Sequence, residues 1–385
     1  MSFMFGDERA KKIRHPESAS ISKHSRVVFA HQLRGIAALL VLVSHYLGVF
    51  FDAPKIVASA TYSPALVMAQ PAWVEVIISR HIFYGPVGVA LFFIISGFVI
   101  PFSLKRLSIK SFLIGRCMRI FPTYWVCFSL SLSIIWLSSL YWSSSIELSP
   151  AHVLSNYLLV QSYMGLPSID LVNWTLSVEF KFYVLASLTL PWFFKHTTRY
   201  CVFISSSTVL ANFLVSCIFP DWKLNSFLLN IFNAAAIEGM YLPFILIGVL
   251  FYMHEQRQIP IRSFMVCAVV LMVGFGLSWA LGPQKEAFPV VPFQYTFALF
   301  LFTFAYLYKE KFKSFLFLDF LADISYPLYA VHGIMGYVVM RVTLDLGFNF
   351  AISFIAALAA AVCLATIIHK LIEVPSNKLG KLWVN

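Results

Sequence analysis

Residues 28–51 read VFAHQLRGIAALLVLVSHYLGVFF, and this stretch indicates both the class of fold and where to look for chemistry. A helix of this length crosses the ~30 Å hydrocarbon core of a bilayer. Arg34 and His45 lie eleven residues apart within it. In an α-helix that spacing is three turns plus roughly 20°, or about 16 Å along the axis. Both side chains therefore point the same way from one predicted membrane helix.

The composition of the whole chain is that of a membrane protein. Of its 385 residues, 60% are apolar and only 12% are charged, whereas soluble domains carry roughly 25% charged residues. The net charge of +11 would suggest nucleic acid as the partner of a soluble protein. Here the basic residues follow alternate loops, so we expect a lipid bilayer and no nucleic acid. The six cysteines form no CxxC pair, so we expect free thiols and no metal site.

Apolar segments of membrane-crossing length recur along the chain. We predict an all-α fold, a polytopic bundle of about ten transmembrane helices at 28–374, between cytoplasmic tails at 1–27 and 375–385. Most Lys and Arg residues lie in the termini and alternate loops, which by the positive-inside rule predicts that both termini are cytoplasmic. The opposite loops hold only Lys55, Arg80, Lys223 and Lys285. The predicted spans are 28–51, 84–104, 120–141, 174–194, 200–219, 239–254, 263–281, 291–308, 318–343 and 350–372.

This orientation gives Arg34 and His45 different surroundings. Arg34 would lie about 9 Å from the cytoplasmic start of its helix and His45 about 26 Å from it. A cation near the cytosol suits an anionic group, whereas a histidine can take a proton from a hydroxyl and return it. Each residue also has an ordinary interpretation, because an arginine near a helix end extends toward water and a core histidine can be hydrogen-bonded to a neighbour. The aligned pair favours function, since ionisable groups within a membrane usually face a cavity or a partner.

Arg116 and Arg119 form a second basic pair, in the sequence GRCMRIFP at 115–122, just before the third predicted span. Their i, i+3 spacing places them on one helix face. Arginine forks bind phosphate in a bidentate way, and this site is predicted to be cytoplasmic. The alternative is ordinary positive-inside charge or contact with lipid headgroups.

Trp174 and Glu179 open the fourth predicted span, in NWTLSVEF at 173–180. Trp174 is typical of an anchor at the membrane surface. Glu179 would lie about one and a half turns deeper, near the depth predicted for His45. A carboxylate there can orient His45, hold a sugar hydroxyl, or pair with Lys181 or another buried cation.

Two more polar residues lie inside predicted spans. Ser96 belongs to LFFIISGF at 91–98, where a Ser-Gly pair allows close helix packing and the hydroxyl can also bind a ligand. His332 belongs to ISYPLYAVHG at 324–333, where it is either a hydrogen-bonded core histidine or a residue of the same cavity.

Together these patterns resemble the acyltransferase-3 family of integral membrane acyltransferases. The matching elements, in the expected order from Arg34 to His332, are R-x10-H, FFxxSGF, RxxRIxP, WxLxxE and SYPLYxxH. The resemblance implies transfer of an acyl group, commonly acetyl, from cytoplasmic acyl-CoA to a carbohydrate or related acceptor across the membrane. It implicates Arg34, His45, Arg116 and Arg119. Some members add an extracytoplasmic hydrolase-like domain, and this chain resembles the stand-alone type.

We therefore expect a multi-pass O-acyltransferase of a bacterial inner membrane. Acetyl-CoA or another acyl-CoA would be the donor, bound by Arg34, Arg116 and Arg119. His45 would act as general base or, alternatively, as a transient acyl carrier, with Glu179 in support and Ser96, Trp174 and His332 lining the cavity. The acceptor would be a hydroxyl of a cell-surface or lipid-linked carbohydrate. Alternatives are an acceptor that is a lipid or small hydrophobic metabolite, and a transporter or flippase of a lipid-linked sugar.

Overall fold

The computed structural model describes residues 16–78, 81–221 and 225–384, and all secondary structure within these ranges is helical. Arg80 and Lys223 lie outside the described residues, as do residues 1–15 of the predicted N-terminal tail. Eight described segments are long and apolar enough to cross a membrane, which confirms a helical membrane bundle. The count of ten and the side of each terminus stay predictions. The eight are Val28–Asp52, Tyr84–Leu104 (α5), Ile109–Tyr141 (α6), Thr197–Ile218 (α9 and η3), Ser226–Glu255 (α10 and α11), Ile261–Leu281 (α12), Val290–Leu307 (α13) and Phe350–Trp383.

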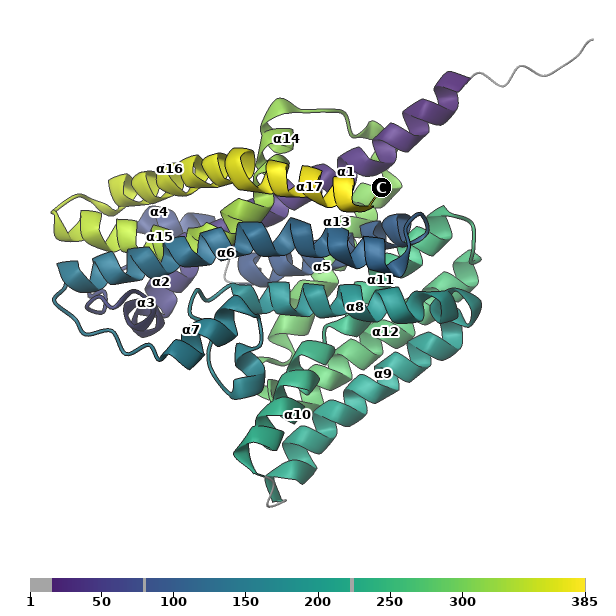
Figure 1. Cartoon of the computed structure of the whole chain (residues 1–385), viewed down its shortest axis with the longest axis horizontal. Coiled ribbons are helices and arrows are strands. Elements are labelled where there is room, and N and C mark those ends of the chain that lie inside the picture. Colours follow the sequence, from purple (N-terminus) through teal and green to yellow (C-terminus); the bar gives the residue numbers. More distant parts are fainter. Residues whose placement is uncertain (1–15, 79–80, 222–224, 385) are drawn as a thin grey trace, which may run out of the picture.

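Two other predicted spans form helices of similar length but higher polarity. They are α8, Asn173–Lys195, and α15, Ser325–Asp345. Figure 1 shows α6, α15 and α16 running alongside one another, and α8 lying between α6 and α9. These two helices carry Glu179 and His332, so the polar residues that lower their hydropathy include predicted site residues.

The first membrane helix changes its winding at Ser44, one residue before His45. Helix α1, Pro16–Val43, continues as a π-helical segment, Ser44–Val49, and then as the short α2, Phe50–Asp52. A π-segment widens the helix locally and occurs often at functional sites. The regular spacing predicted for Arg34 and His45 holds up to Val43, and His45 lies in the first turn of the altered segment.

Helix α6 begins earlier than predicted, because Ser108 caps it. The Ser108 hydroxyl accepts a hydrogen bond from the backbone N–H of Ser111 at 3.1 Å, a typical N-cap that starts a helix there. Arg116 and Arg119 consequently lie inside the helix and not before it. The predicted C-terminal tail is also helical and forms α17, Val374–Val384. This helix packs on the first part of α6, with Gly380 against Met118.

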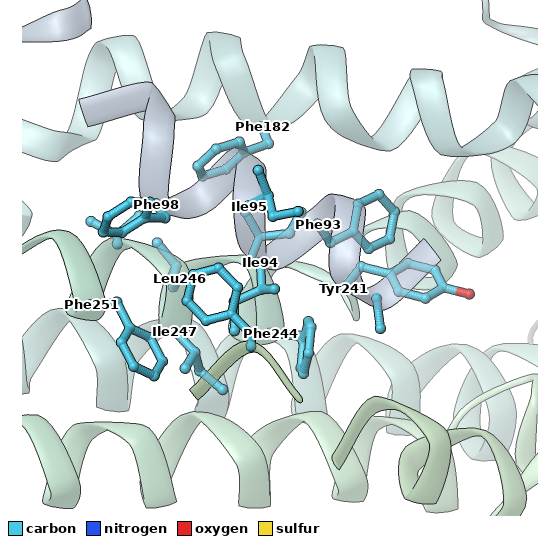
Figure 2. Packing of buried hydrophobic residues seen from close by; sticks show 14 of the residues in the cluster. Phe93, Ile94, Ile95, Phe98, Phe182, Tyr241, Phe244, Leu246, Ile247 and Phe251 are labelled. Atoms are coloured by element: carbon cyan, nitrogen blue, oxygen red, sulfur yellow. The ribbon is translucent and has the colours of Figure 1, made fainter. Parts of the chain in front are cut away.

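The centre of the bundle is the crossing of α5 with α11, Leu242–Glu255. A Cβ atom on Gly97 would lie 1.9 Å from the carbonyl oxygen of Ile245, so only glycine permits this approach. Figure 2 shows the apolar packing around the crossing, with Phe98 of α5, Phe244 of α11 and Phe182 of α8 among its members. Of the Ser-Gly pair, Gly97 therefore has the predicted packing role. The neighbouring Ser96 faces α8, where it bonds Glu179.

The remaining elements are short or divide a longer segment. Figure 1 places α2, α3 and α7 toward one end of the bundle, and the start of α1 and the end of α17 toward the other. Their bounds are α3, Pro54–Thr61; α4, Ala72–Ile77; α7, Pro150–Tyr157; η2, Gln161–Met164; α9, Thr197–Phe213; η3, Leu214–Ile218; η4, Phe219–Asp221; α10, Ser226–Gly239; η5, Lys285–Ala287; η6, Lys309–Lys311; α14, Leu316–Asp323; α16, Phe350–Ile368; and η7, His369–Glu373.

Candidate active site

Arg34 lines a small cavity of about 40 Å³ between α1, α5, α8 and α15. Glu179 and Tyr329 line the same cavity. Arg34 and Glu179 are close enough to interact electrostatically, and so are Arg34, Arg116 and Arg119. Three guanidinium groups thus gather near one carboxylate, and the part of α6 that carries Arg116 and Arg119 packs against α17. Such a cluster attracts an anion of more than one charge, because one carboxylate offsets only part of the positive charge.

Arg116 is held in place by groups that leave room on its guanidinium. Its Nη2 donates a hydrogen bond to the Ser103 hydroxyl at 2.7 Å. The guanidinium also stacks over the rings of Phe112 and Tyr183, at 5.2 and 5.5 Å from their centroids. Because a guanidinium has five N–H donors, most of them stay available for a phosphate.

Glu179 is fixed by two hydroxyl donors. Ser96 donates to its Oε1 at 2.5 Å, and Tyr183 donates to the same oxygen. Lys181 pairs with Glu238, and not with Glu179. Glu179 lines the same cavity as Arg34 and interacts with it electrostatically, without a direct ion pair between them.

His45 lines a second cavity, of about 270 Å³, nearer the opposite end of the bundle. Trp174 of α8 lines it as well, and so do Tyr241 and Tyr295. Aromatic side chains in a cavity of this kind offer flat apolar faces together with hydroxyl groups for orientation. The structure thus brings Trp174 to His45, whereas it brings Glu179 and Ser96 to Arg34.

The ring of His45 is oriented by Tyr337 of α15. Its Nδ1 lies 2.9 Å from the Tyr337 hydroxyl, and the two rings are nearly parallel, at 16°. When Nδ1 donates to this hydroxyl, Nε2 keeps its lone pair and can accept a proton. Histidines that act as general bases commonly have such a second group, here the Tyr337 hydroxyl, that fixes the tautomer of the ring.

His332 lies behind His45 and is fully buried, at 1% exposure. Its Nδ1 faces the carbonyl oxygens of Leu328 and Tyr329, at 3.2 and 2.8 Å, so this nitrogen carries the hydrogen. Its Nε2 is a buried acceptor with no hydrogen-bond partner among the described residues. The rings of His332 and His45 are 4.8 Å apart. His332 is not among the described residues that line either cavity, and it contacts the site through His45.

Val89 and Tyr329 form a wall between the two cavities, because they line both of them. Tyr329 is held there by the Thr175 hydroxyl at 2.8 Å and by the ring of Phe92, 5.5 Å away. Arg34 and His45 therefore line two adjacent cavities that meet at these two side chains. A ligand that reaches from one cavity to the other passes Val89 and Tyr329.

The loop before α8 explains why Glu179 is not at the level of His45. Leu171 and Val172 of this loop line the His45 cavity, so α8 begins only after the chain has entered the bundle. The carboxylate of Asp170, 2% exposed, accepts hydrogen bonds from the backbone N–H groups of Val172 and Asn173, at 3.1 and 2.9 Å. Irregular backbone is tolerated at depth when its polar groups are paired in this way.

Replacing Asp170 with alanine is expected to destabilise this loop. The change leaves the two backbone N–H groups without their acceptor, a loss of about 1–3 kcal/mol in the free energy of unfolding. Asp170→Asn keeps one acceptor oxygen and should lose less. Thermal unfolding followed by tryptophan fluorescence in detergent measures both, and equal midpoints for wild type and Asp170→Ala would contradict the capping role.

Sequence reasoning did not find the tyrosines of the site. Tyr337 bonds His45, Tyr183 bonds Glu179, and Tyr241 and Tyr295 line the His45 cavity. The chain has 17 tyrosines, and neither charge nor spacing marks out these four. Tyr326 and Tyr329, which line the Arg34 cavity, do lie within the motif at 324–333.

Long apolar helices around a buried cationic cluster and a cavity with a histidine define a membrane protein with an enzyme-like site. Residues 27–370 match a family model described as an acyltransferase domain, that of the acyltransferase-3 family. The chain belongs to this family and is a multi-pass membrane acyltransferase. No curated protein matched the chain. No solved structure matched it either.

Proposed function

We propose that the protein transfers an acyl group, by default acetyl, from cytoplasmic acyl-CoA to a carbohydrate hydroxyl at the outer side of a bacterial inner membrane. The main support is that one helix carries both halves of the reaction. Arg34 belongs to a cluster of three arginines, and His45, three turns further on, lines a cavity large enough for reacting groups. The acceptor is a cell-surface or lipid-linked carbohydrate. The largely apolar lining of the His45 cavity also suits a lipid or small hydrophobic metabolite.

The donor binds with its phosphates on Arg34, Arg116 and Arg119. Its extended arm spans the ~16 Å between Arg34 and His45 and displaces Tyr329 to reach the second cavity. Glu179 balances part of the arginine charge before the donor arrives. An unbalanced cluster would be costly at this depth.

In the chemical step, His45 takes the proton of the acceptor hydroxyl, whose oxygen attacks the thioester carbon. The tetrahedral oxyanion collapses, the carbon–sulfur bond breaks, and the CoA thiolate takes the proton back from His45. The products are an ester and free CoA. During this step the ring of His332, whose Nε2 has no hydrogen-bond partner among the described residues, packs against the His45 ring and helps to hold it in place.

Tyr241 and Tyr295 supply the donors for the oxyanion. Both are buried, at 6% and 2% exposure, line the His45 cavity, and have no hydrogen-bond partner for their hydroxyls among the described residues. Figure 2 shows the Tyr241 hydroxyl at the edge of the apolar cluster, pointing away from it. Hydroxyls kept free in this way can stabilise charge that develops during a reaction.

Tyr241→Phe and Tyr295→Phe are each expected to lower kcat by about 10²–10³-fold, the usual effect of losing one oxyanion donor. The KM for acetyl-CoA should not change, because neither hydroxyl touches the arginine cluster. Tyr200→Phe is the matched control, since Tyr200 is buried but pairs with Thr189 elsewhere. A rate loss equal to that of the control would remove the two tyrosines from the chemistry.

The direct test of the function follows ¹⁴C-labelled acetyl-CoA with the purified protein and a membrane or glycan fraction as acceptor. Transfer of label to a free or lipid-linked carbohydrate supports the proposal, label on a lipid without sugar supports the alternative acceptor, and label that stays on CoA contradicts acyl transfer. Mass spectrometry of surface glycans from a deletion strain then reports the acceptor and the added mass together.

A further inference from the structure

A third cavity, of about 390 Å³, adjoins the His45 cavity at Leu171, which lines both. Its walls come from α3, from Ile135 of α6, and from the segment that includes α7 and the loop before α8. Together the two cavities fall in the size range of sites for ligands larger than one ring. The mechanism proposed above uses only the His45 cavity, so the function of the third cavity is open.

Three groups on this cavity are free to bind a polar ligand. Lys55, Ser59 and Tyr62 line it, and their side chains have no hydrogen-bond or ion-pair partner among the described residues. Lys55 is informative because the predicted outer loops hold few basic residues. Among the described ones, Lys285 is the other, and it lies in η5 away from this cavity. An unpaired ammonium beside apolar walls favours an anionic group.

The walls of this cavity are fixed by hydrogen bonds. His152 Nε2 lies 2.9 Å from the carbonyl oxygen of Pro167, and the Ser144 hydroxyl donates to the carbonyl oxygen of Tyr62 at 2.6 Å. Ser168 is held by Asp170 and Asn173, at 3.0 and 2.5 Å. Binding of a ligand here therefore loses little conformational entropy, because the walls are already ordered. The ring of Tyr62 offers a flat face for the C–H side of a sugar.

We propose that the third cavity binds an anionic sugar unit of the acceptor, one that carries a carboxylate or a phosphate, next to the sugar that receives the acyl group. Lys55 binds the anion, while Tyr62 and Ser59 contact the ring. This inference rests on the proposed function, because it supposes a saccharide acceptor at His45. It adds that the acceptor is charged and longer than one sugar.

The test measures saccharide binding without turnover, by saturation-transfer NMR on the protein in phosphatidylcholine nanodiscs. The probes are methyl β-D-glucuronide, glucose 6-phosphate and the neutral methyl β-D-glucoside. At least one anionic probe should bind about fivefold more tightly than the neutral one, the gain expected from one solvent-accessible ion pair. Lys55→Ala should abolish this preference, Lys55→Arg should keep it, and Lys285→Ala, the matched control, should leave it unchanged.

Equal binding of all three probes, or a preference that survives Lys55→Ala, overturns the proposal. Displacement of the anionic probe by phosphatidylglycerol in the nanodisc also overturns it, because Lys55 would then be a lipid-headgroup contact. Acetyl transfer is measured separately. Preferential binding without any transfer retains the saccharide site and rejects the proposed reaction, whereas transfer without the preference rejects only the site.

Discussion

Replacing His45 with alanine is expected to abolish measurable acyl transfer while the protein still inserts and accumulates. Loss of a general base lowers a rate by about 10²–10⁴-fold. The physical reason is that His45 lines the cavity, and Tyr337, at 2.9 Å, and the neighbouring His332 ring orient it. The measurement is incorporation of ¹⁴C-acetyl into the glycan fraction of membranes that contain equal amounts of each variant.

One further variant and one further measurement separate chemistry from folding. Tyr337→Phe removes only the hydroxyl that bonds Nδ1, so it should lower the rate less than His45→Ala does and shift its dependence on pH. The binding of acetyl-CoA should be the same in wild type and His45→Ala, because the arginine cluster lies in another cavity. Normal product from His45→Ala would remove this residue from the mechanism.

Replacing Arg116 and Arg119 with alanine is expected to weaken acetyl-CoA binding by roughly tenfold to a hundredfold for each arginine. A charge-assisted hydrogen bond contributes about 1.5–3 kcal/mol, and each 1.4 kcal/mol is a factor of about ten in Kd. Isothermal calorimetry in detergent measures Kd directly. The loss should shrink as salt is added, since the contacts are ionic.

Arg106→Ala is the matched control for this experiment. Arg106 lies in the loop between α5 and α6, on the same predicted side of the membrane as Arg116 and Arg119. It is exposed, and it is not among the groups that interact with Arg34. Its replacement removes one positive charge from the same predicted side of the membrane. If Kd changes equally in Arg106→Ala and Arg116→Ala, the two arginines of α6 act only as general positive charge.

The helical bundle was predictable because hydropathy over a window of about twenty residues reports membrane helices directly. The segment 84–104 coincides with α5. Helix capping and a local change of winding depend on a few residues, and a mean hydropathy over about twenty residues does not report them. For this reason the start of α6 at Ser108 and the π-segment at Ser44–Val49 could not be predicted.

The site was predictable where its residues are charged and regularly spaced. Arg34, Arg116 and Arg119 do gather around Glu179. Glu179 was predicted to lie near the level of His45, but it lines the Arg34 cavity, whereas the loop that precedes α8 lines the His45 cavity. Lys181, the nearer cation in sequence, pairs instead with Glu238.

The wall formed by Val89 and Tyr329 has a consequence for the energised membrane around the protein. Each elementary charge that leaks across a bilayer dissipates about 2.3 kcal/mol per 100 mV. An open column of water from Arg34 to His45 would conduct protons and short-circuit this voltage. Val89 and Tyr329 place an aliphatic and an aromatic side chain on this path, and such apolar groups would limit the leak until a substrate arm displaces them.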